Sequence, residues 1–241
     1  MKARRGEYGF DAPYVPGFMM LGSLPLWFGA VQALLRGDAV GVATMGLSAG
    51  FLVFCAGTFI FTTRTGKFRV WNELLAGLSL RGDEKVLDVG CGRGAVLLLA
   101  AERLSSGKAT GIDLWSVKDQ SGNALEATQR NAAAEGVSER VELHTGDMRK
   151  LPFPDASFEV IVSSLAIHNV PDAAGRAESV REIARVLKPG GRVLLADFKY
   201  VADYAKTLRE AGLREVQTRR LGVRFWYGGP WAATSLVTAV R

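Results

Sequence analysis

Three glycines at alternate positions interrupt an apolar stretch near the middle of the chain, in the segment KVLDVGCGRGAVLLLA. Backbone without side chains lets a ligand approach closely, so Gly90, Gly92 and Gly94 predict a binding loop between a strand and a helix. The dinucleotide pattern G-x-G-x-x-G would need a glycine at Ala95, and the carboxylate of Asp88 would repel a pyrophosphate. The loop therefore favours a positively charged ligand, such as a sulfonium with an α-amino group, and disfavours a nicotinamide oxidoreductase.

Two further acids follow the next two predicted strands. Asp113, in GIDL, is placed to accept hydrogen bonds from both ribose hydroxyls of an adenosine. Asp147, in GDM, is placed to accept from the exocyclic amine of adenine while Met148 packs against the ring. The three strand ends together predict a ligand that contains adenosine.

His168 and Asp197 are the candidate catalytic residues, because each follows a strand at the same edge of the predicted sheet. An imidazole titrates near neutral pH, so His168 is the best candidate general base; a loop histidine that caps the next turn is the alternative. Asp197 either orients a substrate or only ends its strand. His144 lies within the strand VELHTG and is expected to be a packing residue.

Aromatic residues are concentrated where a substrate wall is expected. The segment RFWYGGPW, with Trp226 and Tyr227, either lines an apolar substrate pocket, touches a membrane, or covers the edge of the sheet. Tyr200 follows the strand that ends at Asp197. Tyr8 belongs to an aromatic and proline-rich segment over residues 1–16, which fits a membrane interface or a lid over the active site.

The alternation of strands and helices after Gly82 predicts an α/β fold. The expected strands are KVLDVG, KATGIDL, RVELHTGD, FEVIVSSLAIHN, RVLLADF, REVQTRR and WAATSLVTAVR. Helices are expected between them, one ending at Gly136 and one stopped by Pro189. Because no helix separates the last two strands, we expect a doubly wound seven-stranded sheet whose last strand is antiparallel.

The first sixty residues contain two uncharged segments, 17–35 and 39–61, joined by the polar turn RGD. Each has the length of a helix that crosses a hydrocarbon core of about 30 Å. They predict a transmembrane hairpin over 17–61; a buried soluble hairpin is the alternative. Basic residues on both outer flanks place the N-terminus and the domain over 62–241 in the cytoplasm, at the inner cell membrane.

The composition is compatible with a membrane-associated enzyme. The chain has 241 residues, of which 48% are hydrophobic, and a formal net charge of +6. This mild positive charge fits an anionic ligand or membrane surface, and no basic run interleaved with aromatics indicates nucleic acid. The two cysteines, Cys55 and Cys91, have neither a disulfide framework nor a zinc spacing, so no metal is expected.

The motifs, taken in order, resemble those of class I S-adenosylmethionine (SAM)-dependent methyltransferases, closest to the branch that methylates small molecules, quinones and lipids. LDVGCGRG is similar to that family's first motif, GID to its second, GDMRKLPFPDASFEVIVSSLAIHNV to its third and fourth, and EIARVLKPGGRVLLADF to its post-catalytic segment. The resemblance covers about residues 85–198. It implies the seven-stranded fold, with SAM as cofactor and S-adenosylhomocysteine as product.

The resemblance also implies cofactor-binding residues at the ends of the first four strands: Asp88, Gly90, Gly92, Gly94, Asp113, Leu114, Trp115, Asp147, Met148 and Ser163. Leu114 and Trp115 would flank the adenine or ribose, and Ser163 to Leu165 would face the methyl donor. The connection after Asp113 is longer than is usual in the family. Its polar residues, Asn123 among them, are expected to form an additional loop against the cofactor.

These observations predict a membrane-anchored methyltransferase for an apolar or membrane-associated acceptor: a quinone, a lipid, or a lipophilic small molecule with an O, N or S nucleophile. A methyltransferase acting on a membrane protein and a non-catalytic SAM-binding scaffold are the alternatives. The oligomeric state and the identity of the acceptor are left open at this point.

Overall fold

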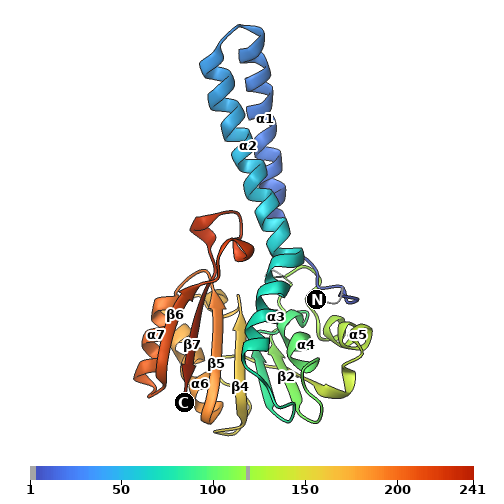
Figure 1. Ribbon diagram of the computed structural model, residues 1–241, viewed down its shortest axis with the longest axis vertical. Helices are drawn as coiled ribbons and strands as arrows, with labels where there is room; N and C mark the ends of the chain where they lie inside the picture. Colours follow the sequence, from blue (N-terminus) through green and yellow to red (C-terminus); the bar gives the residue numbers. More distant parts are fainter. Residues whose placement is uncertain (1–3, 118–119) are drawn as a thin grey trace.

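The computed structural model describes residues 4–117 and 120–241 and shows an α/β domain from which a long helical hairpin projects (Figure 1). Residues 1–3 of the predicted N-terminal segment and residues 118–119 of the connection after Asp113 lie outside the described residues. The domain places its ligand-binding edge directly below the hairpin.

Seven strands form one mixed sheet, in the order β3-β2-β1-β4-β5-β7-β6. The strands are β1 (Lys85–Val89), β2 (Lys108–Asp113), β3 (Val141–Thr145), β4 (Phe158–Ser164), β5 (Leu187–Asp197), β6 (Arg214–Arg220) and β7 (Ser235–Val240). The first five pair in parallel, and β7 is antiparallel to both of its neighbours. This confirms the predicted seven-stranded sheet. The order reverses between β1 and β4, which is where ligands bind in such sheets.

Helices cover both faces of the sheet, as two buried clusters show. On one face lie α3 (Lys67–Gly77), α4 (Ala95–Ala101) and α5 (Leu125–Glu135); on the other lie α6 (Ala173–Val186) and α7 (Val201–Glu210). Successive strand residues alternate between the clusters: Val86 packs with α3 and α4, and Leu87 packs with α6 and α7. Burial on both faces explains why the parallel strands read as continuous apolar runs.

Two helix ends show how local chemistry sets the boundaries. Gly136 ends α5 in the left-handed conformation, at φ 73°, as the sequence predicts. α6 ends at Val186, three residues before Pro189, and β5 begins at once. The residue before a proline disfavours the helical conformation, so the helix stops earlier than the proline itself.

The hairpin consists of α1 (Tyr14–Leu35) and α2 (Ala39–Phe61). Asp38 caps α2, since its carboxylate accepts from the Gly41 amide at 2.9 Å. α1 begins three residues before the predicted start. α2 has no break at residue 62: a π-helical turn, Thr62–Gly66, carries it into α3, giving one helix of 39 residues. The hairpin is therefore joined to the domain by a continuous helix.

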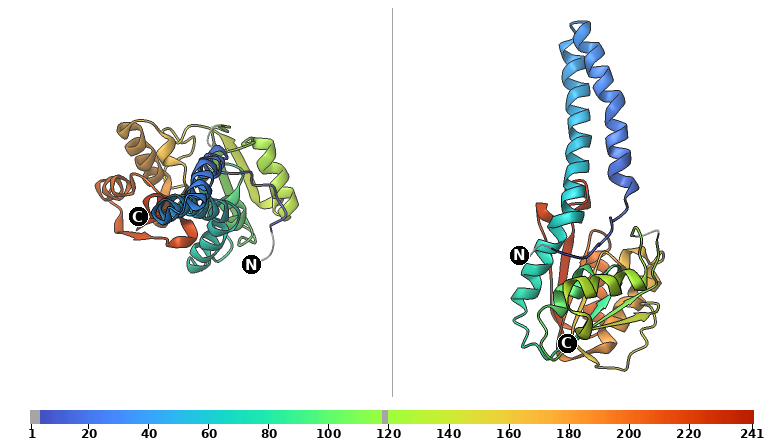
Figure 2. Two further views of the ribbon diagram at one scale, coloured as in Figure 1. Left: turned by 90° about the horizontal axis from the view of Figure 1, so that it is seen from above. Right: turned by 90° about the vertical axis from the view of Figure 1, so that its right-hand side faces the viewer.

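Both hairpin helices are long and apolar enough to cross a membrane, by length and composition. Only 17% of the residues in the most apolar window of each helix are buried inside the structure. Large side chains such as Phe18, Leu47 and Phe54 are exposed. The hairpin projects away from the domain (Figure 2), and its apolar side chains are largely uncovered, in contrast to those of a buried soluble hairpin.

Candidate active site

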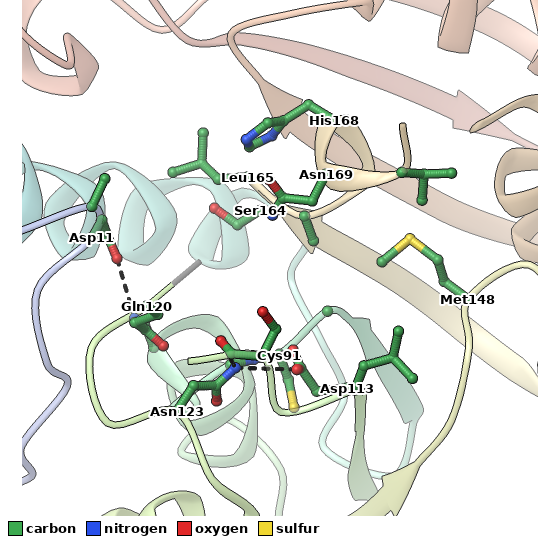
Figure 3. Close-up of a pocket in the computed structure, with 18 of the residues that line it drawn as sticks. Asp11, Cys91, Asp113, Gln120, Asn123, Met148, Ser164, Leu165, His168 and Asn169 are labelled. Carbon is green, nitrogen blue, oxygen red and sulfur yellow. Dashed lines mark hydrogen bonds between the residues drawn. The ribbon is translucent and has the colours of Figure 1, made fainter. Parts of the chain in front are cut away.

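A cavity of about 760 Å³ lies at the carboxyl ends of the central strands, between the glycine loop and the base of the hairpin (Figure 3). The glycine loop and the ends of β2 and β3 line one half of it. The turn after β4 and the segment after β5 line the other half. Tyr14 and Val15 of α1, Phe59 of α2 and Tyr227 of the C-terminal loop complete the wall. The site therefore joins the predicted cofactor region to the apolar hairpin.

The glycine loop has backbone conformations and close contacts that require glycine. Gly90, Gly92 and Gly94 have φ values of 74°, 50° and 84°. A Cβ on Gly90 would lie 2.2 Å from the Cβ of Ala166, and one on Gly92 would lie 2.7 Å from Oε1 of Gln120. Gly90 and Gly92 line the cavity, whereas Gly94 precedes α4 outside it. Bare backbone therefore faces the ligand at two of the three predicted positions.

Asp113 lies at the end of β2 with its carboxylate held by nearby donors. Oδ2 accepts from the Gly92 amide at 2.8 Å, and Oδ1 accepts from the Trp115 amide at 2.6 Å and from Nδ2 of Asn123 at 3.2 Å. These bonds fix the position of the acid relative to the glycine loop. Asn123 is buried, and its Oδ1 has no hydrogen-bond partner among the described residues. A donor on a ligand would satisfy that oxygen.

Asp88 is buried at the start of the glycine loop, and in the part of the chain that the structure describes neither carboxylate oxygen has a hydrogen-bond partner of good geometry. Burial raises its pKa to about 8; the Leu97 amide opposes this, and the negative charge of Asp113 adds to it. A buried acceptor without a donor is costly unless a ligand supplies one. The ammonium group of SAM has three donors and a positive charge, so this residue fits the cofactor predicted for it.

Three other predicted cofactor residues lie on the cavity wall: Leu114, Asp147 and Met148. The Asp147 carboxylate already binds the Arg149 guanidinium, with Oδ2 at 2.6 Å from Nη2, and this hydrogen bonding lowers the pKa of Asp147. Leu114 is largely exposed, and Met148 packs beneath the loop. Their contacts with adenosine stay predictions.

Trp115 and Ser163 do not line the cavity, which corrects the positions expected for them. Trp115 has φ 59° and donates from its indole nitrogen to Thr145 on β3, which turns the ring away. Ser163 donates to the Val89 carbonyl inside the sheet, whereas Ser164 and Leu165 of the same predicted segment line the cavity. Adjacent strand residues point to opposite faces, so a shift of one position exchanges the two serines.

His168 lines the opposite half of the cavity, in a short 3₁₀ turn after β4. Its Nδ1 lies 2.9 Å from Oδ1 of Asp197, which meets the distance of an ion pair but not the alignment of a hydrogen bond. Asp197 lies behind it, outside the cavity, and its Oδ2 accepts from the His168 amide and from the Tyr204 hydroxyl, each at 3.2 Å. Asp197 can thus hold the imidazole of His168 in place, which leaves Nε2 available to take a proton from a methyl acceptor. His144, in contrast, packs edge-on against Phe153.

Of the four predicted substrate residues, only Tyr227 lines the cavity. Tyr8 is buried elsewhere, where its hydroxyl lies between Arg4 and Glu135. The ring of Tyr200 lies under the guanidinium of Arg176, 3.7 Å from its centroid.

Trp226 is the fourth of the predicted substrate residues, and it directly precedes Tyr227, which reaches the cavity. Its carbonyl accepts from the Thr62 hydroxyl at 2.7 Å, and it forms an isolated bridge with Ala233. The sequence alone does not distinguish Tyr8, Tyr200 and Trp226 from Tyr227, because the direction of each side chain depends on partners far away in the chain.

Asp11 is a cavity residue that the sequence analysis missed. Its Oδ2 is 2.7 Å from Nζ of Lys67 and 2.8 Å from the Tyr227 hydroxyl, and its Oδ1 accepts from Nε2 of Gln120 at 3.2 Å. These partners come from α3, the C-terminal loop and the loop after β2. The signal available in the sequence was the acid Asp11 within the aromatic run Tyr8–Tyr14. Asp11 joins the N-terminal segment to three walls of the site.

Among the described residues, no group of three or more His, Cys, Asp or Glu side chains is placed to hold a metal ion. Residues 86–191 match the family model described as a methyltransferase domain. The glycine loop, Asp113 and His168 all lie within this stretch.

The chain is 35% identical over 153 residues to 27-O-demethylrifamycin SV methyltransferase of Amycolatopsis mediterranei, covering 60% of this chain and 52% of that protein. It is 36% identical over 131 residues to the demethylmenaquinone methyltransferase of Symbiobacterium thermophilum, covering 54% and 49% respectively. The matched region thus spans about half the length of these curated relatives.

The fold is also similar to the crystal structure of a SAM-dependent methyltransferase from Aquifex aeolicus, with a TM-score of 0.54, 21% identity, and coverage of 70% of this chain and 88% of that one. The family model and the curated relatives support the predicted methyltransferase domain over residues 86–191, the crystal structure shows the fold, and the unpartnered carboxylate of Asp88 fits the predicted cofactor SAM. The predictions of domain class and cofactor are confirmed at this level.

Proposed function

We propose that this chain is a membrane-anchored methyltransferase that moves the methyl group of SAM to an apolar acceptor held at the lipid. One observation carries the proposal: the cavity that begins at the glycine loop is closed by Tyr14, Val15 and Phe59, at the base of two exposed apolar helices. An acceptor that leaves the lipid along these helices would arrive beside the cofactor half of the site.

Three features support membrane anchoring at the inner cell membrane. The hairpin helices have the required length, their apolar surface is uncovered, and their outer ends carry basic residues such as Arg5 and Arg64. Under the positive-inside rule, the N-terminus and the domain lie in the cytoplasm. The turn at Arg36 and Asp38 lies on the opposite side.

The proposed acceptor is a quinone-like ring, a lipid or another lipophilic small molecule. The relative from Symbiobacterium thermophilum is named for demethylmenaquinone, and that from Amycolatopsis mediterranei for 27-O-demethylrifamycin SV. The acceptor half of this cavity combines apolar walls with His168, Asn169 and Lys199. This combination suits a ring with a polar substituent at one end.

The residues of the chain act mainly by positioning and by excluding water. When bound, SAM supplies an activated methyl group and a good leaving group. Asp88 would hold its ammonium and Asp113 its ribose, while His168 accepts a proton from an acceptor that arrives protonated. Asp197 keeps the imidazole oriented. The contacts of Asp11 close the wall between the N-terminal segment and the C-terminal loop, which keeps the site dry.

Calorimetric titration of the detergent-solubilised protein with S-adenosylhomocysteine tests the cofactor site. We expect micromolar binding that Asp113→Ala abolishes and that Asp83→Ala, at an exposed turn, leaves unchanged. Absence of binding to the intact protein would contradict the proposal. Transfer of radiolabelled methyl groups to demethylated quinones, phospholipids and lipophilic thiols then tests the acceptor. Binding without transfer would favour a non-catalytic scaffold, and labelling of a membrane protein would favour a protein acceptor.

A further inference from the structure

The loop between β6 and β7, residues 222–233, rises along the outside of the hairpin helix (Figures 1 and 2). We call it the insertion loop. It leaves the sheet at Leu221 and returns at Thr234, which pair through the Leu221 amide and the Thr234 carbonyl at 3.0 Å. Its position beside α2 determines which medium surrounds it once the hairpin is in a membrane.

The insertion loop contacts one face of the helix over about four turns. The Arg224 carbonyl packs against Gly66, the Trp226 carbonyl accepts from Thr62, and the ring of Tyr227 meets Phe59 at 5.0 Å.

Further along the same face, Gly228 lies against the backbone of Cys55, and the ring of Trp231 lies 5.5 Å from that of Phe51. Residues 66, 62, 59, 55 and 51 are spaced by three or four, so they form a single stripe about 22 Å long.

We propose that the tip of the insertion loop, residues 226–233, lies within the lipid leaflet nearest the domain, with Trp231 as its deepest side chain, while Arg224, paired with Glu73, stays at the level of the head groups. This inference rests on the proposed membrane anchoring. The part of α2 beyond the contact with Trp231, Ala39–Gly50, is about 18 Å long at 1.5 Å per residue. A hydrocarbon core is about 30 Å thick. A hairpin that crosses the membrane must therefore bring the tip of the loop into the lipid.

The chemistry of the loop suits that medium. Trp231 is 59% exposed and lies beside the exposed Phe51 of the helix, so apolar surface continues from the helix onto the tip of the loop. Val223, at the base of the loop, is 57% exposed. Backbone in a lipid environment needs internal partners. The loop provides several, with the amides of Phe225, Tyr227 and Ala232 donating to carbonyls of the loop itself.

Basic residues mark the level at which the loop would leave the lipid. Arg219 and Arg220, at the end of β6, are exposed immediately before the loop. Basic side chains at this level attract anionic head groups. The partner of this surface is therefore a phospholipid leaflet that contains anionic lipid. Because Tyr227 and Ala232 of the same loop line the cavity, the loop also forms one wall of the passage from lipid to site.

Depth measurement by spin labelling tests this inference. The full chain, with Cys55→Ala and Cys91→Ala, is reconstituted in vesicles of phosphatidylcholine with phosphatidylglycerol. Labels are attached singly through Trp231→Cys, Val223→Cys, Leu47→Cys on the hairpin and Glu139→Cys at the far end of the domain. For each label, the rate of collision with oxygen, which concentrates in lipid, is compared with the rate of collision with a water-soluble nickel chelate.

We expect a ratio of oxygen to nickel collisions at positions 231 and 47 that is severalfold higher than at position 139, with position 223 between them. A ratio at 231 and 223 equal to that at 139, with a high ratio at 47, would overturn the inference while membrane anchoring stands. Equal low ratios at 47 and 231 would overturn the anchoring and the inference together. Val223→Cys keeps the test valid if Trp231→Cys does not fold.

Discussion

The two halves of the cavity are built by different kinds of contact. In the cofactor half, Asp113 is held by donors that lie 21, 2 and 10 residues away in the chain. In the wall between the N-terminal segment and the C-terminal loop, Asp11 meets partners that lie 56, 109 and 216 residues away. The first is a local structure set by two consecutive strands, β1 and β2, and the loops that follow them. The second exists only when the N-terminal segment, the hairpin and the C-terminal loop are all in place.

This difference teaches which parts of the protein are free to vary. A local loop keeps its geometry when distant parts of the chain change, so one cofactor site can serve many acceptors. The acceptor half is assembled at the root of the hairpin, and its shape follows from where that hairpin and the insertion loop lie. Changes in the first half should affect cofactor binding alone, and changes in the second should affect the acceptor.

The largest effect is expected at Gly90. In Gly90→Ala, the new Cβ meets Ala166 at the floor of the cavity, in a conformation that disfavours side chains. We expect binding of S-adenosylhomocysteine to weaken by about 100-fold or more, since the clash and the strain together cost about 3 kcal/mol. Calorimetry measures it. Gly136→Ala, at nearly the same φ but facing open space, is the control that should lose stability and keep binding.

The second effect concerns His168. His168→Ala should lower kcat by about 100-fold for an acceptor that must lose a proton, because a positioned general base contributes about that much. Binding of S-adenosylhomocysteine should not change, since the residue lies in the other half. His144→Ala, which loses only a packing contact with Phe153, is the matched control. An unchanged kcat in His168→Ala would assign a structural role to this histidine.

The third effect concerns charge in the cofactor half. Asp88→Asn should weaken S-adenosylhomocysteine binding by about tenfold, because an ion pair with the ligand ammonium is lost. The wild type should release part of a proton on binding at pH 7, since its pKa of about 8 falls when the cation arrives. Calorimetry in buffers of different ionisation enthalpy measures this release. Release that persists in Asp88→Asn would assign it to another group.

The same residue predicts a pH dependence of stability. The pKa of Asp88 is raised from 3.8 in the unfolded chain to about 8 in the folded chain. As the pH rises, ionisation of this carboxyl therefore stabilises the unfolded chain more than the folded chain. The free energy of unfolding of the ligand-free wild type should therefore fall between about pH 4 and pH 8 and then level off. Asp88→Asn should lack this part of the fall, which chemical denaturation at a series of pH values measures.

The smallest effect on catalysis is expected at Asp11, because its contacts only close the wall of the cavity. Asp11→Asn keeps the shape but leaves Lys67 buried without its charged partner, which should cost about 2 kcal/mol of stability. KM for the acceptor should rise severalfold while cofactor affinity changes little. Hydrogen exchange over residues 4–12 should increase. A loss of cofactor affinity as large as that in Gly90→Ala would show that the two halves are not independent.

Much of this protein can be derived from its sequence, because the physics involved is local. Burial of parallel strands on both faces requires apolar runs, positive φ requires glycine, and a helix end at Gly136 needs no distant partner. These rules place Asp88, Gly90, Gly92 and Asp113 at one edge of a seven-stranded sheet. They also mark two uncharged segments of membrane-spanning length.

Only the tertiary structure decided which side chains face the cavity. Within the predicted segment Ser163 to Leu165, Ser164 and Leu165 line it while Ser163 does not. Trp115 turns to β3, and Tyr227 reaches the site while Tyr8, Tyr200 and Trp226 do not. Asp11 is a member of the site because three elements distant in sequence converge on it. Sequence determines which contacts a residue is able to make, but a partner 216 residues away is chosen by the packing of the whole chain.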